Sequence, residues 1–364
     1  MTNAKFSDSN LSLVVFHLSF LVPRRSKRLP AMDKVRVGVV GVGALGYHHA
    51  RVYAALPQAK LVGVADKVPG RAEQIALPLE TVGYTDYRQL FGKVDAVSIA
   101  TPTTLHGEIG EQFLDEGVHV LVEKPIADSL EEADRLIRAA SRNRKILQVG
   151  HLERFNPAVR AVRTIVQRPR FIEAHRMGLF SPRSLDIDVI LDLMIHDLDI
   201  ILLLVPSQPS RIHAVGIPIL SKRIDIANAR IDFEDGCVAN ITASRVSMEK
   251  IRKLRMFHAQ QYVSLDYSKQ EVAVFGLKPS MEGNFPEIVS RRISPPRLEP
   301  IEQEIRAFLA AGCGTGPVEC TGDEGKRALD LGLRILAQAK QAQALECKGV
   351  EGRRSGGAEG QNDK

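Results

Sequence analysis

Residues 35–46 read VRVGVVGVGALG, a short apolar run that leads directly into a Gly-x-Gly-x-x-Gly motif. The run is typical of a buried β-strand, and the residues after it can open a helix. In such a unit Gly41 permits a tight turn, Gly43 lets backbone N–H groups approach a pyrophosphate, and Gly46 lets helix and strand pack closely. The helix N-terminus would favour the phosphate charge. A glycine-rich turn without a ligand is the alternative. The predicted cofactor contacts are Gly41, Val42, Gly43, Ala44, Leu45 and Gly46.

Asp66 ends the second predicted strand, 61–65, twenty residues after Gly46. A carboxylate at this place can accept hydrogen bonds from the adenosine ribose, and it repels a 2′-phosphate. The sequence therefore favours NAD over NADP. Lys67, also a predicted cofactor contact, partly offsets that repulsion. The alternative for Asp66 is a simple turn residue.

The first part of the chain alternates apolar runs with helical stretches, which is typical of a parallel sheet covered on both faces. We predict strands at 35–40, 61–65, 94–100, 119–122 and 146–149, and helices at 44–56, 69–77, 105–116 and 129–142. The predicted fold class is α/β, with an N-terminal doubly wound Rossmann domain over 32–150.

After Gly150 the pattern changes to that of an α+β domain, predicted over 151–345. Two alternating runs within 226–245 meet at Glu234-Asp235-Gly236, which predicts a β-hairpin. We expect a large, mainly antiparallel sheet with helices on one face. Further strands are predicted at 171–176, 252–258, 262–267 and 271–275, and helices at 155–166, 188–205, 302–311 and 323–342.

Two further motifs, Thr101-Pro102 with His106 and Glu123-Lys124-Pro125, follow strand ends in the order and spacing of a known family. The chain resembles the glucose–fructose oxidoreductase / inositol dehydrogenase / rhizopine-catabolism (Gfo/Idh/MocA) family from about residue 34 to 342. The resemblance implies an NAD-dependent dehydrogenase acting on CH–OH groups, and a homodimer or homotetramer that covers the open sheet face. It implies a catalytic or substrate-orienting Lys124; a solvated surface lysine is the alternative. It also implies cofactor contacts at Thr101, Pro102, His106 and Glu123.

The apolar stretch 188–205 places Asp192, His196 and Asp199 at i, i+4 and i+7, on one stripe of a helix. Asp192 can hydrogen-bond one imidazole nitrogen and support a proton on the other. The resemblance makes Asp192 and His196 a catalytic pair. An ordinary charge pair on a buried helix and half of a metal site remain as alternatives; we predict no metal.

The stretch GHLERFNPA at 150–158 is similar to the branch of the family that oxidises the 3-hydroxyl of UDP-N-acetylglucosamine. The 3-keto product would suit 3-amino-sugar formation for lipid A or another envelope glycan. Arg154 offers a planar fork for a diphosphate, and Asn156 can bind a sugar amide or cap a helix before Pro157. An inositol or free-sugar dehydrogenase and a non-catalytic dinucleotide-binding regulator are the alternatives. The predicted substrate contacts are Lys124, Arg154, Asn156, Arg183 and His196; Arg245, Lys250 and Arg252 are weaker candidates for phosphate binding.

Composition excludes several classes of protein. With 44% hydrophobic and 25% charged residues among 364, the chain is neither disordered throughout nor fibrous. The net charge of +6 is concentrated in residues 1–31, so the body lacks the basic surface of a nucleic-acid binder. Four cysteines without a Cys-x-x-Cys pair favour a reduced, cytoplasmic protein. No apolar run reaches the roughly 18 to 20 residues of a membrane-spanning helix, so we expect no membrane partner. We expect 1–31 to be a disordered leader and 346–364 a disordered tail.

Overall fold

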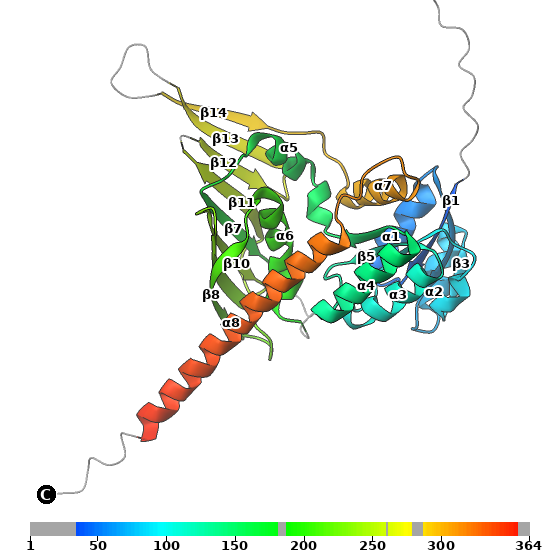
Figure 1. Ribbon diagram of the computed structural model, residues 1–364, viewed down its shortest axis with the longest axis horizontal. Coiled ribbons are helices and arrows are strands. Elements are labelled where there is room, and N and C mark those ends of the chain that lie inside the picture. Colours follow the sequence, from blue (N-terminus) through cyan, green and yellow to red (C-terminus); the bar gives the residue numbers. More distant parts are fainter. Residues whose placement is uncertain (1–33, 181–186, 260, 279–286, 356–364) are drawn as a thin grey trace, which may run out of the picture. The chain divides into compact units, whose positions relative to one another are not determined.

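Two β-sheets organise the chain (Figure 1). The computed structural model describes residues 34–180, 187–259, 261–278 and 287–355, and the part from Lys34 onward forms one compact unit. The predicted leader, 1–31, and Arg183 lie outside the described residues. Within the described part, no helix combines the length and the apolar character that a membrane span requires.

The first sheet is parallel and has six strands in the order β3-β2-β1-β4-β5-β6. This order reverses between β1 and β4, and in doubly wound sheets ligands bind outside the strand carboxyl ends at such a reversal. The strands are β1 (Val35–Val40), β2 (Ala59–Ala65), β3 (Val82–Tyr84), β4 (Ala96–Ile99), β5 (His119–Glu123) and β6 (Leu147–Gly150). The helices between them are α1 (Ala44–Ala55), α2 (Arg71–Ala76), α3 (His106–Asp115) and α4 (Leu130–Asn143), with 3₁₀ turns at Leu77–Leu79, Tyr87–Leu90 and Thr103–Leu105.

The second sheet has eight strands in the order β14-β13-β12-β11-β7-β10-β9-β8, antiparallel except for the β7–β10 pair. Side chains of β7 alternate between buried and half-buried, because one face packs on helices and the other does not. The strands are β7 (Phe171–Met177), β8 (Pro209–Ile217), β9 (Ile226–Phe233), β10 (Val238–Ser244), β11 (Ile251–His258), β12 (Gln261–Asp266), β13 (Glu271–Lys278) and β14 (Glu287–Ile293). The covering elements are a 3₁₀ turn (Leu152–Phe155), α5 (Pro157–Ile165), a π-helical turn (Ile190–Met194), α6 (Ile195–Leu204) and α8 (Gly322–Ser355).

Helix α7 (Pro300–Gly312) and the residues just before α8 return to the first sheet (Figure 1). Ile305 and Phe308 of α7 belong to the same buried cluster as Val37 and Val39 of β1. Just before α8, the carbonyl of Cys320 accepts a hydrogen bond from the Val149 backbone N–H. The N-terminal sheet is therefore completed by residues from the end of the chain.

The predicted fold class is confirmed, with four differences. The short strand β3 and the strands β8 and β14 were not predicted. Most side chains of β14 are exposed, and β8 is half-polar with a glycine near its end, so neither carries a clear apolar signal. The expected disorder from 346 onward is wrong as far as Ser355, because α8 continues to that residue.

Candidate active site

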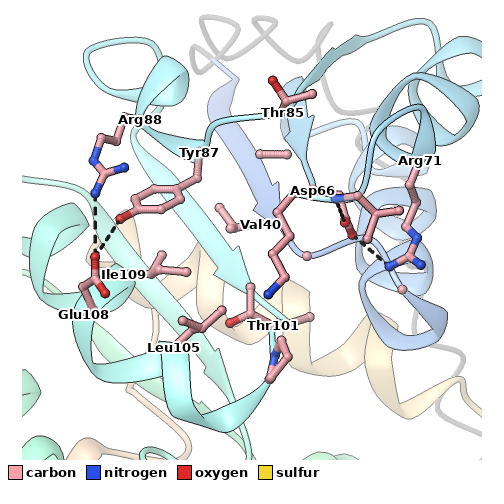
Figure 2. Close-up of a pocket in the computed structure, with 17 residues that line it drawn as sticks. Val40, Asp66, Arg71, Thr85, Tyr87, Arg88, Thr101, Leu105, Glu108 and Ile109 are labelled. Carbon is pink, nitrogen blue, oxygen red and sulfur yellow. Dashed lines mark hydrogen bonds and ion pairs between the residues drawn. The ribbon is translucent and has the colours of Figure 1, made fainter.

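A cavity of about 390 Å³ opens where the order of the first sheet reverses (Figure 2). Its floor is formed by the ends of β1, β2 and β4 and the loops that follow them. Predicted cofactor residues that line it are Gly41, Gly43, Asp66, Lys67, Thr101 and Pro102. Arg71, Tyr87 and Arg88 also line it, and sequence reasoning missed them.

The three motif glycines meet different surroundings. Gly41 has φ +80, and a Cβ there would lie 2.7 Å from the Ala100 carbonyl oxygen. A Cβ on Gly46 would lie 1.8 Å from the Gly41 carbonyl oxygen, so this glycine is required for helix–strand packing. A Cβ on Gly43 would meet no protein atom within 4 Å. The fold therefore does not require glycine at position 43. The empty space where its Cβ would lie is part of the cavity that Gly43 lines.

Asp66 is buried at the end of β2 and joins both sides of the turn. Its Oδ2 accepts a hydrogen bond from the Val42 backbone N–H at 3.0 Å, and its Oδ1 accepts one from Val68 N–H at 2.9 Å. An Arg71 nitrogen lies 3.5 Å from Oδ2, and Figure 2 shows the two side chains facing each other. Each carboxylate oxygen retains acceptor capacity for a ribose hydroxyl.

These features fit a dinucleotide. Gly43 is the N-cap of α1, with no side chain capping the helix and no acidic residue in its first turn. The unpaired N–H groups of that turn and the open space at Gly43 suit a pyrophosphate. Across the cavity, Arg88 lies 3.6 Å from Glu108, whose carboxylate also accepts from Tyr87 (Figure 2).

The predicted cofactor contacts His106 and Glu123 do not line this cavity. His106 is buried, and its ring nitrogens lie 2.9 Å from the Pro125 carbonyl oxygen and 3.0 Å from that of Thr101. It therefore ties the Thr101-Pro102 turn to the Lys124-Pro125 turn. Burial lowers the pKa of His106, so the ring is neutral near pH 7 and only one nitrogen donates at a time. Glu123 points to His49 instead, at 2.9 Å.

Lys124 follows the end of β5, one strand from the cavity floor. Its Nζ donates a hydrogen bond to the Asp192 carbonyl oxygen at 2.7 Å and lies 3.5 Å from the Asp192 carboxylate. Two segments 68 residues apart thus meet at this lysine. The structure brings two of the three predicted catalytic residues, Lys124 and Asp192, together as oppositely charged side chains.

His196 lies one turn further along, at the start of α6, half-buried. Its Nδ1 is buried and has no hydrogen-bond partner among the described residues. Burial, and then the positive charges of Lys124 and Arg176, hold the pKa of His196 well below its usual range. The imidazole is therefore neutral near pH 7 and able to accept a proton.

The expected Asp192–His196 hydrogen bond is not formed. Asp192 faces Lys124 instead. It lies within the π-helical turn Ile190–Met194, so the α-helical spacing that would align Asp192, His196 and Asp199 on one stripe does not hold there. Asp199, the third member of the predicted stripe, binds Arg154 instead.

The structure corrects the expectation that Arg154 is open to a ligand. Arg154 is 3% exposed, and its guanidinium donates to both Asp199 oxygens, to Glu324 and to the Glu319 carbonyl. Asn156 is buried as well: its Oδ1 caps α5 by accepting from Ala158 N–H, and its amide donates to the Tyr267 carbonyl. Of the two interpretations of Asn156, the structure therefore supports the helix cap.

Among the weaker candidates, Arg245 is buried and donates to the carbonyls of Ile187 and Ile224, whereas Lys250 is exposed. Arg252 is half-buried, and burial and the neighbouring Arg176 lower its pKa. Arg176, which pairs with Asp197 at 2.6 Å, was not predicted, because its partner lies 21 residues away on another element.

Comparison with known proteins agrees with this geometry. Residues 35–151 match the profile of the Gfo/Idh/MocA oxidoreductase family with an NAD-binding Rossmann fold, and 158–264 match the Gfo/Idh/MocA C-terminal domain. The chain belongs to this family. UDP-N-acetylglucosamine 3-dehydrogenase from Acidithiobacillus ferrooxidans is 39% identical over 305 residues, 84% of this chain and 97% of that protein. A crystal form of that enzyme superposes with a TM-score of 0.80 at 37% identity, over 85% of this chain and 99% of that one.

A more distant relative, inositol 2-dehydrogenase from Rhizobium meliloti, is 28% identical over 333 residues, 84% of this chain and 98% of that protein. Membership of the Gfo/Idh/MocA family makes the chain an NAD-binding oxidoreductase, as the sequence predicted. Its relatives are dehydrogenases of sugar and polyol hydroxyls. The cavity lined by Gly41, Gly43 and Asp66 lies within the residues that match the NAD-binding Rossmann domain.

Proposed function

We propose that the protein oxidises the 3-hydroxyl of UDP-N-acetylglucosamine to the 3-keto sugar, with NAD⁺ as acceptor. The observation that carries the proposal is the 39% identity to the Acidithiobacillus enzyme across 97% of its length. Inositol dehydrogenases match with lower identity over comparable lengths, which makes a polyol substrate the second candidate. A 3-keto nucleotide sugar is a substrate for amination, which would place the enzyme in envelope 3-amino-sugar synthesis.

Lys124, Asp192 and His196 carry the proposed chemistry. The Lys124 ammonium donates to the substrate oxygen and stabilises the charge that develops as the proton leaves. Asp192 holds the lysine through its backbone and side-chain oxygens. The neutral His196 imidazole takes the hydroxyl proton. When bound in the cavity, NAD⁺ supplies the hydride acceptor.

We assign the cofactor to the cavity residues. Gly41, Gly43 and the N-terminus of α1 would hold the pyrophosphate, and Asp66 the adenosine ribose. Lys67, Thr101 and Pro102 line the same cavity. His106 and Glu123 would act from behind it, through the turns that they hold.

NADH formation with UDP-N-acetylglucosamine, myo-inositol and glucose tests the substrate. We expect turnover with the nucleotide sugar, and a product whose keto group is at C3 by NMR. Turnover of a free polyol alone would refute the assignment. Absence of turnover with any of them, together with NAD binding and capture of a protein partner, would favour a regulator. Lys124→Met should abolish turnover, whereas Lys60→Met, an exposed lysine on β2, should not.

We further propose a homodimer or homotetramer formed through the helix-free face of the second sheet. Half-buried rings of Phe171, Phe257, Tyr262 and Phe275 stack across four strands, with centroids 4.9–5.5 Å apart. Exposed apolar side chains of Val215, Ile217, Leu277 and Ile288 lie on strands of the same sheet. Aromatic and apolar side chains on an uncovered sheet face are suited to an interaction site. Cys237, Cys313 and Cys320 are free thiols, which supports a cytoplasmic location.

A further inference from the structure

A buried polar chain lies behind the strand that carries Lys124. The Tyr53 hydroxyl lies 2.8 Å from Ser98 Oγ, which lies 3.2 Å from His49 Nδ1. His49 Nε2 lies 2.9 Å from Glu123 Oε1, and the other Glu123 oxygen accepts from the Lys124 backbone N–H at 3.2 Å. Glu123 therefore connects the buried chain to the backbone of Lys124.

The protons of this chain can be placed so that each hydrogen bond has one donor and one acceptor. Burial raises the pKa of Tyr53, so its hydroxyl stays protonated and donates to Ser98. Ser98 then donates to His49 Nδ1, which leaves Nε2–H to donate to Glu123. Glu123 is thus the anionic end of the chain, and both of its oxygens accept a hydrogen bond.

Glu304 of α7 is the group that this chain leaves without a partner. Its side chain is 0% exposed, and neither carboxylate oxygen has a hydrogen-bond partner among the described residues. One of its oxygens lies within 4.8 Å of the facing atoms of both His49 and Glu123. Ionisation of the second of two enclosed carboxylates at this separation is strongly disfavoured unless a cation lies between them.

We propose that Glu304 is a neutral carboxylic acid, directed at the Glu123–His49 pair, and that it is a positioning residue for Lys124. The acid proton removes the repulsion that would displace Glu123, and so keeps the end of β5 in place. Burial and the Glu123 charge raise the pKa of Glu304 well above its usual range, in agreement with the geometry. The positioning role rests on the proposed role of Lys124.

A divalent cation is the competing occupant of the three groups. It is disfavoured because His49 and Glu123 are already in hydrogen-bond contact at 2.9 Å, and His49 Nδ1 has its own partner in Ser98. The side chains of His49, Glu123 and Glu304 are at most 9% exposed, so a metal ion would have no open path to the site. The proton and the cation predict opposite effects of the Glu304→Gln substitution on stability.

The thermal stability of Glu304→Gln against pH tests the protonation state. The titratable groups that face Glu304 are His49 and Tyr53 from α1, Glu123 from β5, and Cys320 before α8. The folded chain holds a proton that the unfolded chain releases above its ordinary carboxyl pKa, so wild-type stability falls as pH rises from about 4.5 toward the raised pKa. The uncharged amide escapes this loss. Relative to wild type, the variant's folding equilibrium constant should increase about tenfold per pH unit in that range.

Infrared spectroscopy of the holoenzyme supplies the second readout, since the band of a protonated carboxyl should vanish in Glu304→Gln. A lower melting temperature of Glu304→Gln than of wild type at pH 8, or stoichiometric zinc by mass spectrometry that the variant loses, would overturn the neutral acid. Both readouts are independent of turnover and therefore of the proposed substrate.

Steady-state kinetics test the positioning role. Glu304→Gln should keep kcat within about 2-fold of wild type, because the amide fills the same buried space without a charge. Glu304→Ala leaves a cavity beside Glu123 that lets the end of β5 shift, so it should lower kcat about 10-fold or more with the NAD Kd unchanged. A folded Glu304→Ala protein with wild-type kcat would end the positioning role. If Lys124→Met loses turnover while Glu304→Ala keeps normal kinetics, only the positioning role of Glu304 fails. If Lys124→Met keeps turnover, the proposed mechanism itself fails.

Discussion

Replacing Gly43 by alanine separates the cofactor function of the glycine turn from its folding function. Gly43 has φ −69, which alanine adopts freely, and the added Cβ would touch no protein atom within 4 Å. The smaller entropy of the unfolded chain favours the variant by about 0.4–1 kcal/mol, and the poorer N-cap offsets this by a similar amount. The melting temperature should therefore change by no more than about 2 °C.

NAD affinity should respond quite differently. The methyl group would occupy the space in which we place the pyrophosphate, so at least one charge-assisted hydrogen bond to the α1 N-terminus would be lost. Such a bond contributes about 1.5–3 kcal/mol, which corresponds to an increase in Kd of about 10- to 150-fold. Isothermal titration with NAD⁺ and calorimetric melting of the same protein measure both quantities. Gly46→Ala is the matched control: its Cβ would lie 1.8 Å from a backbone oxygen, so it should fail in folding. Unchanged NAD affinity in stable Gly43→Ala would refute the phosphate site.

Three other changes have defined outcomes. His196→Asn should lower kcat on the order of 10² to 10⁴ with normal NAD affinity, because the imidazole serves the substrate; full turnover would shift the base role to Lys124. Arg154→Met should destabilise the fold by about 3–5 kcal/mol in denaturant titrations, since it leaves Asp199 buried and unpaired; a raised KM at wild-type stability would restore the ligand role instead. Because burial lowers the pKa of His106 and His196, the unfolded chain binds protons that the folded chain does not, and stability should fall as pH drops below about 6.5. Melting temperatures between about pH 7.5 and 5.5 check this, and a smaller slope in His196→Asn would assign its share.

The extent of sequence-based prediction differs between the fold and the site. The strands of the first sheet are continuous apolar runs, so β1, β2, β4, β5 and β6 could be predicted, whereas the three residues of β3 carry too little pattern. The glycine turn and Asp66 could be placed because their roles depend on neighbours close in sequence. Arg154 and Asp199 are 45 residues apart, and no local pattern shows that their side chains pair with each other.

The site also depends on a π-helical turn that the sequence pattern does not predict. The stretch around Asp192 reads as a regular amphipathic helix, yet its first turn is π-helical. The lysine that Asp192 contacts lies on the other sheet, so only the tertiary structure could show that Asp192 faces Lys124 rather than His196. Arg71 begins α2 and Arg88 lies in a 3₁₀ turn, and both were missed because basic side chains are usually solvated. Only the cavity identifies them.

The return of α7 to the first sheet has a consequence for biosynthesis. The last strand of that sheet ends at Gly150, but the core positions filled by Ile305 and Phe308 are translated more than 150 residues later. At about 5–20 residues per second, the ribosome exposes an unfinished apolar surface for roughly 8–30 s. During that interval the nascent nucleotide-binding half exposes the kind of apolar surface that chaperones cover, and premature termination before α7 is expected to leave a fragment prone to aggregation.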